Sequence, residues 1–490
     1  MYPPEEPPQP SLAAVGDRST PGQMCFAGPG YSCRMGGTDN PLWEMLMAIA
    51  LTVLEETSPG IGACVLLEYE GKRLLLDCGY DDSEASGRSV SFPVPAGSIH
   101  AVVLSHGHLG HCGLLPVLVR EGFAGKVYCT ADTGKVATLG MLEAALLQAE
   151  EKQYWVSKGQ SDRAAEPIYT ESEVTACESF LTPCRAGERV PVDEYVTLEF
   201  LRAGHCPGSA FVKIDVRQGA SSRKILYIGD AGTRNNALQA GSVVNDAYDA
   251  VLLPALRAAR QDAGEIESGL GEIINRACEA EGNVLIPVSS IDRRDAILQA
   301  IQHLSARKRI PSVFVFLDSP IASRQCEVLP LEPRNSRVYV CLCPSDTVED
   351  SKTLNTVQGG AIFIASSGKA GYGRIAFHLK RNLPRPEAAL VLFGEQLGRL
   401  FGQSLGDGCK TLSIHGQEIE VKAQIHRLED PTVHLDATAA AEWLARMKSM
   451  PQHTYIVHGT QEVKAHFCNA LQGCGIPNVH MPAAGEKTTL

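Results

Sequence analysis

The stretch that decides the fold is Leu104-Ser105-His106-Gly107-His108-Leu109-Gly110-His111-Cys112-Gly113. It continues the apolar run that begins at Ala101, which predicts a buried strand. Three histidines within six residues, just after a strand, are typical of a loop folded around Zn²⁺. Zinc binds imidazole nitrogens at about 2.0–2.1 Å. We therefore expect a metal-binding loop at the end of this strand.

Further candidate ligands lie at the ends of later predicted strands. His205 follows one strand in AGHCPGSA, Asp230 ends the next in YIGD, and His458 ends a late one in VHG. Strand ends and the loops after them are where α/β folds assemble their sites. One histidine at a strand end is more often structural than a ligand. Four such segments together indicate a shared metal site.

Apolar runs rich in β-branched residues alternate with helical stretches from about residue 100 onward. The predicted strands include AVVLSH, KVYCT, VTLEFLRAGH, AFVKIDV, KILYIGD, AVLLP, NVLIPV, SVFVFLD, AIFIAS, ALVLFG, KTLSIHG, EIEVKAQIHRL and HTYIVHG. Helices are expected over 293–304 and from about residues 436 and 462. This alternation predicts parallel-type sheets covered by helices.

The composition is that of an ordinary globular protein, with 490 residues, 44% hydrophobic and 20% charged. A net charge of −12 gives no global attraction to nucleic acid, so such binding would need a local basic surface. The sixteen cysteines form no CxxC pair, which predicts reduced thiols in a cytoplasmic protein. The apolar stretch 45–54 is too short to span a membrane.

The order of these motifs resembles a known family. Asp77 in LLLDCG, the histidine loop, AGHCPGSA and YIGD are similar to the successive motifs of the metallo-β-lactamase superfamily. The later segments IPVSS, FLDSPIA, IASSGKAGYGR, TVHLD and VHGT resemble its β-CASP branch, which contains RNA-processing nucleases.

The resemblance implies an α/β protein with a four-layer αββα metallo-β-lactamase fold and an inserted α/β β-CASP domain. We expect a disordered extension over 1–49, the first part of the metallo-β-lactamase domain over 50–258, the β-CASP domain over 259–430, and the C-terminal part over 431–490.

The resemblance also implies roles for individual residues. A first zinc would be bound by His106, His108 and His205, and Asp230 would bridge it to a second zinc bound by His111 and His458. The remaining roles are leaving-group protonation by His434, support of the histidine loop by Asp77, and phosphate binding by Ser366, Ser367 and Arg374. Asp230 and His434 are thus the predicted catalytic residues.

Three positions depart from the family pattern. Gly110 stands where a carboxylate normally binds the second zinc, Pro254 replaces an acidic residue, and Thr460 replaces the usual acid after VHG. Each change removes negative charge near the metal centre, while all first-metal ligands are kept. We therefore predict one firmly held zinc and a second that is weak or absent.

Three functions agree with this pattern. The first is a ribonuclease that hydrolyses phosphodiester bonds of single-stranded RNA with a weakened second metal site. The second is a catalytically silent homologue that binds RNA or a partner nuclease, and the third is a hydrolase of small esters. The inserted domain favours a nucleic-acid strand over a small ester as the substrate. A homodimer or a partner nuclease is a further candidate interaction.

Overall fold

A computed structural model describes residues 49–55, 57, 61–81, 90, 92–219, 221–231, 243, 245–255, 263–328, 338–342, 347–367, 373–393, 410–428 and 435–490. The predicted extension lies outside the described residues except for Ile49, which is buried in the core. His434, the predicted proton donor, also lies outside them.

The first sheet runs in the order β22-β1-β2-β3-β4-β5-β6 among the described residues. Its strands are β1 (Ala50–Val53), β2 (Val65–Tyr69), β3 (Lys72–Leu76), β4 (Ala101–Val103), β5 (Lys126–Thr130), β6 (Leu181–Cys184) and β22 (Lys487–Thr489). Strands β2 and β3 form a hairpin, because they pair antiparallel around Glu70 and Gly71.

The second sheet runs in the order β21-β20-β11-β10-β9-β8-β7 in the described part. Its strands are β7 (Arg189–Pro191), β8 (Val196–Arg202), β9 (Ala210–Gln218), β10 (Ser221–Ile228), β11 (Ala250–Pro254), β20 (His453–His458) and β21 (Val479–His480). The late strand β20 pairs in parallel with β11, so the C-terminal segment completes a sheet begun much earlier in the chain.

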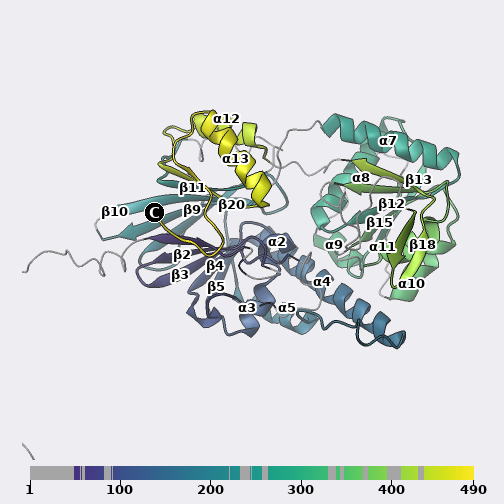
Figure 1. The fold of residues 1–490 in the computed structure, drawn as a ribbon, viewed down its shortest axis with the longest axis horizontal. Helices are drawn as coiled ribbons and strands as arrows, with labels where there is room; N and C mark the ends of the chain where they lie inside the picture. Colours follow the sequence, from purple (N-terminus) through teal and green to yellow (C-terminus); the bar gives the residue numbers. More distant parts are fainter. Residues whose placement is uncertain are drawn as a thin grey trace, which may run out of the picture. The chain divides into compact units, whose positions relative to one another are not determined.

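Side-chain alternation along the strands produces four layers. In β2, Leu67 packs between the two sheets, whereas Leu66 packs toward the outer helices of the first sheet. In β10, Tyr227 faces the inner layer and Leu226 the outer one. The outer helices are α2 (Leu109–Cys112), α3 (Leu115–Arg120), α4 (Ala131–Ser157) and α5 (Glu171–Cys177) on one side, and α12 (Ala437–Ala445) and α13 (Gln461–Gly473) on the other (Figure 1). The predicted αββα fold is confirmed.

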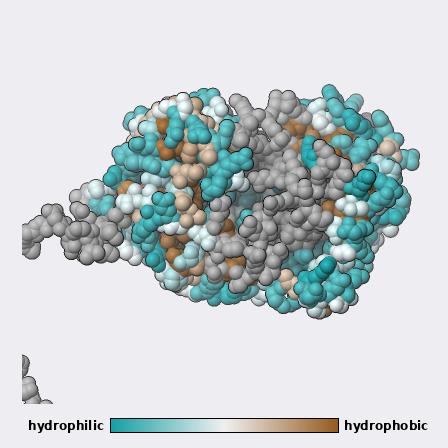
Figure 2. All heavy atoms as spheres, in the orientation of Figure 1, coloured by the Kyte–Doolittle hydropathy of each residue, from teal (hydrophilic) through white to brown (hydrophobic). Residues whose placement is uncertain are grey.

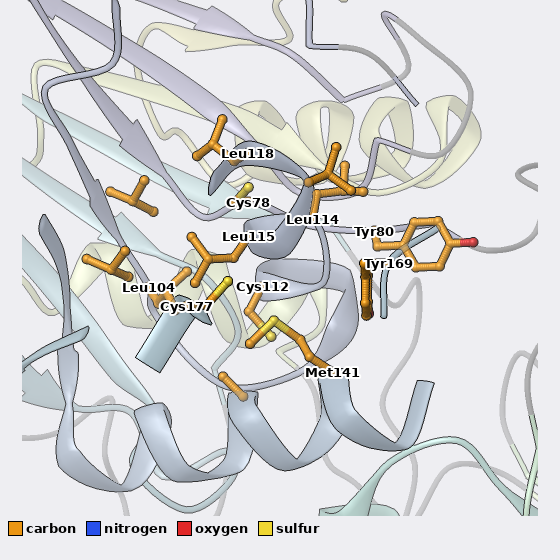
Figure 3. Packing of buried hydrophobic residues seen from close by; sticks show 14 of the residues in the cluster. Cys78, Tyr80, Leu104, Cys112, Leu114, Leu115, Leu118, Met141, Tyr169 and Cys177 are labelled. Atoms are coloured by element: carbon orange, nitrogen blue, oxygen red, sulfur yellow. The ribbon is translucent and has the colours of Figure 1, made fainter. Parts of the chain in front are cut away.

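The core beneath the histidine loop is tightly packed. Cys112, which ends α2, is fully buried and belongs to the same apolar cluster as Leu104, Leu115, Met141 and Cys177 (Figure 3). Its sulfur therefore anchors the loop by packing, although it directly follows a predicted ligand.

A third sheet is inserted between β11 and β20, with the order β14-β13-β15-β12-β16-β19 in the described residues. Its paired strands are parallel: β12 (Val284–Val288), β13 (Val313–Asp318), β14 (Val338–Leu342), β15 (Ala361–Ser366), β16 (Ala389–Phe393) and β19 (Gln424–Leu428). The helices of this region are α7 (Ala263–Glu279), α8 (Ile291–Ala306), α9 (Ala322–Val328), α10 (Val348–Thr353) and α11 (Ile375–Asn382). Apolar side chains fill both faces of the sheet, with α8 on one and α11 on the other, as the predicted inserted α/β domain requires.

The segment 418–428, expected to be one strand, forms two. Strand β18 (Gln417–Glu420) pairs with β17 (Thr411–Ile414) in a hairpin, whereas β19 joins the six-stranded sheet beside β16. Between them, the amides of Lys422 and Ala423 both donate to the carbonyl oxygen of Leu383. The prediction of one strand was wrong because the chain changes partners there.

Within the described residues, the structure has no helix long and apolar enough to cross a membrane. On the face shown in Figure 2, hydrophilic side chains predominate among those that are coloured. Among the described residues, the buried cysteines Cys64, Cys78 and Cys129 have free thiols.

Candidate metal centre

The predicted ligands meet where strands of the two large sheets end. The histidine loop follows β4, His205 follows β8, Asp230 follows β10, and His458 is the last residue of β20. Short α2 begins immediately after His108 and carries His111 in its single turn. The fold thus brings together residues that are more than 350 positions apart.

Four of these residues form a compact group. Potential ligand atoms of His106, His108, His205 and Asp230 all lie within 4.8 Å of one another. The Asp230 Oδ2 atom is 3.4 Å from His106 Nε2 and 3.4 Å from His205 Nε2. His205 Nε2 is also 3.4 Å from His108 Nδ1.

These separations fit a tetrahedral zinc site. Ligands at about 2.0–2.1 Å from a central ion are about 3.3–3.4 Å from one another at the corners of a tetrahedron. The buried His106 Nε2 atom, moreover, has no hydrogen-bond partner in the described part of the chain. A buried ring nitrogen without such a partner is costly unless an ion occupies the space beside it.

Hydrogen bonds fix the outward-facing nitrogens of the histidine rings. Asp77 Oδ2 is 2.7 Å from His111 Nδ1, and Ser105 Oγ is 2.9 Å from His106 Nδ1. His458 Nδ1 lies 2.5 Å from Glu55 Oε1. Such partners set the tautomer and orientation of a metal-binding ring, leaving its other nitrogen for the ion.

The Asp77 carboxylate is fully buried and accepts four hydrogen bonds. Its donors are the Ser105 amide, the Ser105 hydroxyl, His111 Nδ1 and the Tyr227 hydroxyl, all at 2.7 Å. Burial alone would raise the pKa of Asp77, but the rings of His111 and His106 hold it below its ordinary value. Asp77, His106 and His111 are also close enough to form a ligand group. We regard this group as hydrogen-bonding support, because the carboxylate is already saturated by donors.

The protonation states of His106 and Asp230 suit a metal site. Burial is the main cause that lowers the pKa of His106 to about 4, and the neighbouring His111 adds to the effect. Burial alone would raise the pKa of Asp230, but His111 and His106 hold it well below its ordinary value. At neutral pH the structure therefore offers a neutral imidazole and a charged carboxylate, the forms that bind zinc.

The predicted second group is more open. His111 Nε2 lies 3.6 Å from Asp230 Oδ1, and the rings of His111 and His458 have centroids 5.1 Å apart. Within the described ranges, these three residues do not form a group as compact as the first. Gly110 lies beside His111 in α2, and a Cβ built there would meet nothing within 4 Å. The structure thus has room where the usual carboxylate is missing.

The other two departures have local backbone roles. Pro254 ends β11 next to His458 in the strand register, and the following Ala255 amide donates to the His458 carbonyl oxygen at 2.7 Å. Thr460 caps the N-terminus of α13, where its hydroxyl accepts from the Val463 amide.

A cleft beside the compact group contains two of the predicted substrate-binding residues. Its lining combines parts of the histidine loop and α4 with the ends of β12 and β15: Tyr80, Gly107, His108, Leu109, Val136, Gly140, Glu143, Ala144, Leu147, Val288, Ser289, Ser290, Ile291, Ser366 and Ser367. The Ser366 hydroxyl is buried and has no hydrogen-bond partner among the residues described. Ser366 and Ser367 therefore lie on the same cleft as His108.

Arg374, predicted to bind phosphate, is fully buried and is not part of that lining. Its guanidinium donates to both oxygens of Glu150, at 2.6 and 3.0 Å, and to the Thr347 carbonyl oxygen at 2.8 Å. The buried Asp318 carboxylate lies 3.8 Å away. In this structure, Arg374 thus joins α4 to the inserted domain, and its phosphate-binding role stays a prediction.

Replacement of Arg374 by alanine is expected to lower the free energy of unfolding by about 3–5 kcal/mol, because it leaves the Glu150 and Asp318 carboxylates without their shared cation. Urea denaturation would measure the change. Arg385→Ala is the matched control, because its partly exposed pair with Glu387 is expected to contribute only about 0–1 kcal/mol. An Arg374→Ala loss no larger than that of the control would contradict a stabilising role for the buried pair.

Two acidic residues beside the histidines were not predicted from the sequence as part of the site. Glu55 follows β1 and reaches His458, whereas Asp292 lies in the first turn of α8 and reaches His108. The available signal was a carboxylate soon after an apolar run, at Leu54-Glu55 and at Ser290-Ile291-Asp292. Isolated acids at such positions are common, so the signal alone is weak.

Comparison with known proteins agrees with this architecture. Three family models match successive parts of the chain: the Metallo-beta-lactamase superfamily at 57–266, the Beta-Casp domain at 296–405, and the Zn-dependent metallo-hydrolase RNA specificity domain at 418–482. A crystal structure of a protein of unknown function from Enterococcus faecalis V583 matches 90% of this chain and 100% of its own, with a TM-score of 0.51 and 13% identity. That likeness concerns the fold alone.

Several relatives cover most of the chain. Ribonuclease TTHA0252 from Thermus thermophilus is 31% identical over 421 residues, which are 82% of this chain and 91% of that protein. An RNase J-like protein from Methanocaldococcus jannaschii is 24% identical over 84% of this chain and 92% of its own length. Transcription termination factor FttA from the same organism is 24% identical over 84% of this chain and 67% of its own. The chain therefore belongs to the metallo-β-lactamase superfamily and, within it, to the β-CASP branch.

Proposed function

We propose that this protein is a metal-dependent ribonuclease that hydrolyses phosphodiester bonds of single-stranded RNA. The observation that carries the proposal is the compact group of His106, His108, His205 and Asp230, with three ligand-to-ligand separations of 3.4 Å. The match to an RNA specificity domain and the ribonucleases among the relatives support RNA as the substrate class.

The four residues of the compact group would hold one zinc ion firmly. A bound divalent ion supplies Lewis-acid chemistry and activates water for attack on phosphorus. The protein's contribution is to present the neutral imidazole of His106 in a fixed orientation and to keep Asp230 ionised between the two groups of histidines. His111 and His458 would hold a second ion only weakly, because Gly110 supplies no carboxylate.

RNA would enter the cleft that contains His108, Ser366 and Ser367. The serine hydroxyls are suited to hydrogen-bond backbone phosphates, and such contacts set the register of a strand without reading its sequence. Because the net charge is −12, attraction to RNA must be local and therefore sensitive to salt. We further propose that His434 protonates the leaving group, as the family resemblance implies.

We infer that the protein works in a reducing, cytoplasmic compartment, which agrees with its free cysteines in the described residues. We also infer that the metallo-β-lactamase domain comprises 50–258 and 431–490, and the β-CASP domain 259–430. A second copy or a partner nuclease is a candidate partner in RNA processing.

The proposal is tested by incubating the purified chain, supplied with zinc or manganese, with labelled single-stranded RNA and, separately, with a chromogenic carboxylic ester. We expect cleavage of RNA and no turnover of the ester. Ester turnover without RNA cleavage would favour a small-molecule hydrolase instead. If the wild type and a Gly110→Asp variant both bind RNA but do not cleave it, the result would favour the catalytically silent homologue.

A further inference from the structure

We propose that Asp292 is a positioning residue that holds His108 in the orientation and tautomer needed to bind the metal. The inference rests on the proposed metal-dependent function, but it concerns a residue outside the predicted ligand set. Asp292 Oδ1 lies 2.6 Å from His108 Nε2, although the two residues are 184 positions apart. The aspartate side chain is 7% exposed, so little water competes for this bond.

The direction of the bond determines which ring nitrogen is available. An ionised carboxylate only accepts hydrogen bonds, so His108 must carry a proton on Nε2. The Nδ1 atom is then the nitrogen left for an ion. Nδ1 is also the atom that lies 3.4 Å from His205 Nε2, within the compact group. The hydrogen bond and the ligand geometry therefore require the same arrangement of the ring.

Asp292 also adds negative charge close to a centre that has lost a carboxylate at Gly110. A carboxylate behind a metal-binding imidazole raises the basicity of the ring and strengthens its bond to the ion. Asp292 cannot replace the missing ligand of the second group, because its partner, His108, belongs to the first. We therefore expect Asp292 to strengthen the first site specifically.

The position of Asp292 links the metal site to the inserted domain. It lies in α8, which packs on the six-stranded sheet, whereas His108 belongs to the loop after β4. Nearby, Glu143 of α4 accepts hydrogen bonds from the Ser319 hydroxyl at 2.5 Å and from the Gln325 amide at 3.1 Å. The hydrogen bond that orients His108 thus forms only when the inserted domain lies against the histidine loop.

The test is a zinc titration of metal-free full-length protein in competition with a chromogenic chelator, without RNA. Asp292→Ala is expected to weaken binding of the first zinc by about 10–100-fold. Asp292→Asn keeps a hydrogen-bond acceptor but loses the charge, so an intermediate loss is expected. Asp295→Asn is the matched control, because this aspartate of the same helix bonds to Arg294 at 2.7 and 2.9 Å. Its zinc affinity should be unchanged.

A second measurement does not depend on any variant. In zinc-loaded protein with ¹⁵N-labelled histidines, the ring signals of His108 should show Nδ1 bound to metal and Nε2 protonated. Metal on Nε2, or wild-type zinc affinity in folded Asp292→Ala, would overturn the proposal. Because neither measurement uses RNA, weakened zinc binding in a protein that cuts no RNA would sustain this inference while refuting the ribonuclease function.

Discussion

Gly110→Asp is expected to raise the affinity for a second metal ion by about 10–100-fold, the order of effect found when the surroundings of a metal site gain or lose a carboxylate. RNA cleavage should rise with occupancy of that site. The new carboxylate would lie between His108 and His111 in the sequence. It would offset the positive charge of an ion bound by the more open group, which consists of His111, His458 and Asp230. Metal content after dialysis and the initial rate of cleavage measure the two effects.

The local structure favours this substitution. A Cβ at Gly110 would meet no atom within 4 Å, and Gly110 is not among the glycines with positive φ. The residue lies in the first turn of α2, where a negative side chain is favourable. Gly110→Asn is the matched control, because it has the same shape without the charge. Equal metal content and activity in the two variants would contradict a role for the lost carboxylate.

His205→Ala is expected to reduce RNA cleavage by about a thousandfold or more, which corresponds to several kcal/mol of lost transition-state stabilisation. The variant removes a nitrogen that lies 3.4 Å from both His108 Nδ1 and Asp230 Oδ2. Bound zinc should fall in parallel. Cleavage rate and zinc content, measured on the same preparation, test this expectation.

The control for His205→Ala is His303→Ala. His303 lies in α8 with a side chain that is 43% exposed, so its loss should leave both metal content and cleavage unchanged. If His205→Ala cuts RNA as fast as the wild type, the compact group is not the catalytic centre. A loss of cleavage with full zinc content would instead place His205 outside the ligand set.

Much of the fold could be predicted from local patterns. Apolar runs predicted many strands of the two large sheets, because both faces of these strands are buried: Leu226 and Tyr227 of β10 pack on opposite faces. The motif containing His458 correctly predicted that the chain returns to the first domain, because β20 pairs with β11. The single strand expected over 418–428 failed, because periodicity does not show that a strand changes sheets.

The candidate ligands were predictable because each lies in a short motif at the end of a predicted strand. His106, His108 and His111 share one loop, and this motif made the metal centre recognisable from the sequence. The contact between Asp292 and His108 joins residues 184 positions apart and leaves no periodic signal. The same holds for Arg374, because its partner Glu150 lies 224 positions earlier, on a helix whose packing depends on the whole fold.

The central claim is tested most directly by removing and restoring the metal in the wild-type chain. The protein would be stripped with a chelator, titrated with zinc or manganese, and assayed for cleavage of single-stranded RNA at each step, with bound metal measured in parallel. We predict that cleavage disappears on stripping and returns as metal is restored, with one tightly bound ion per chain. Cleavage that persists in stripped protein, or no cleavage at any metal concentration, would contradict the proposed function.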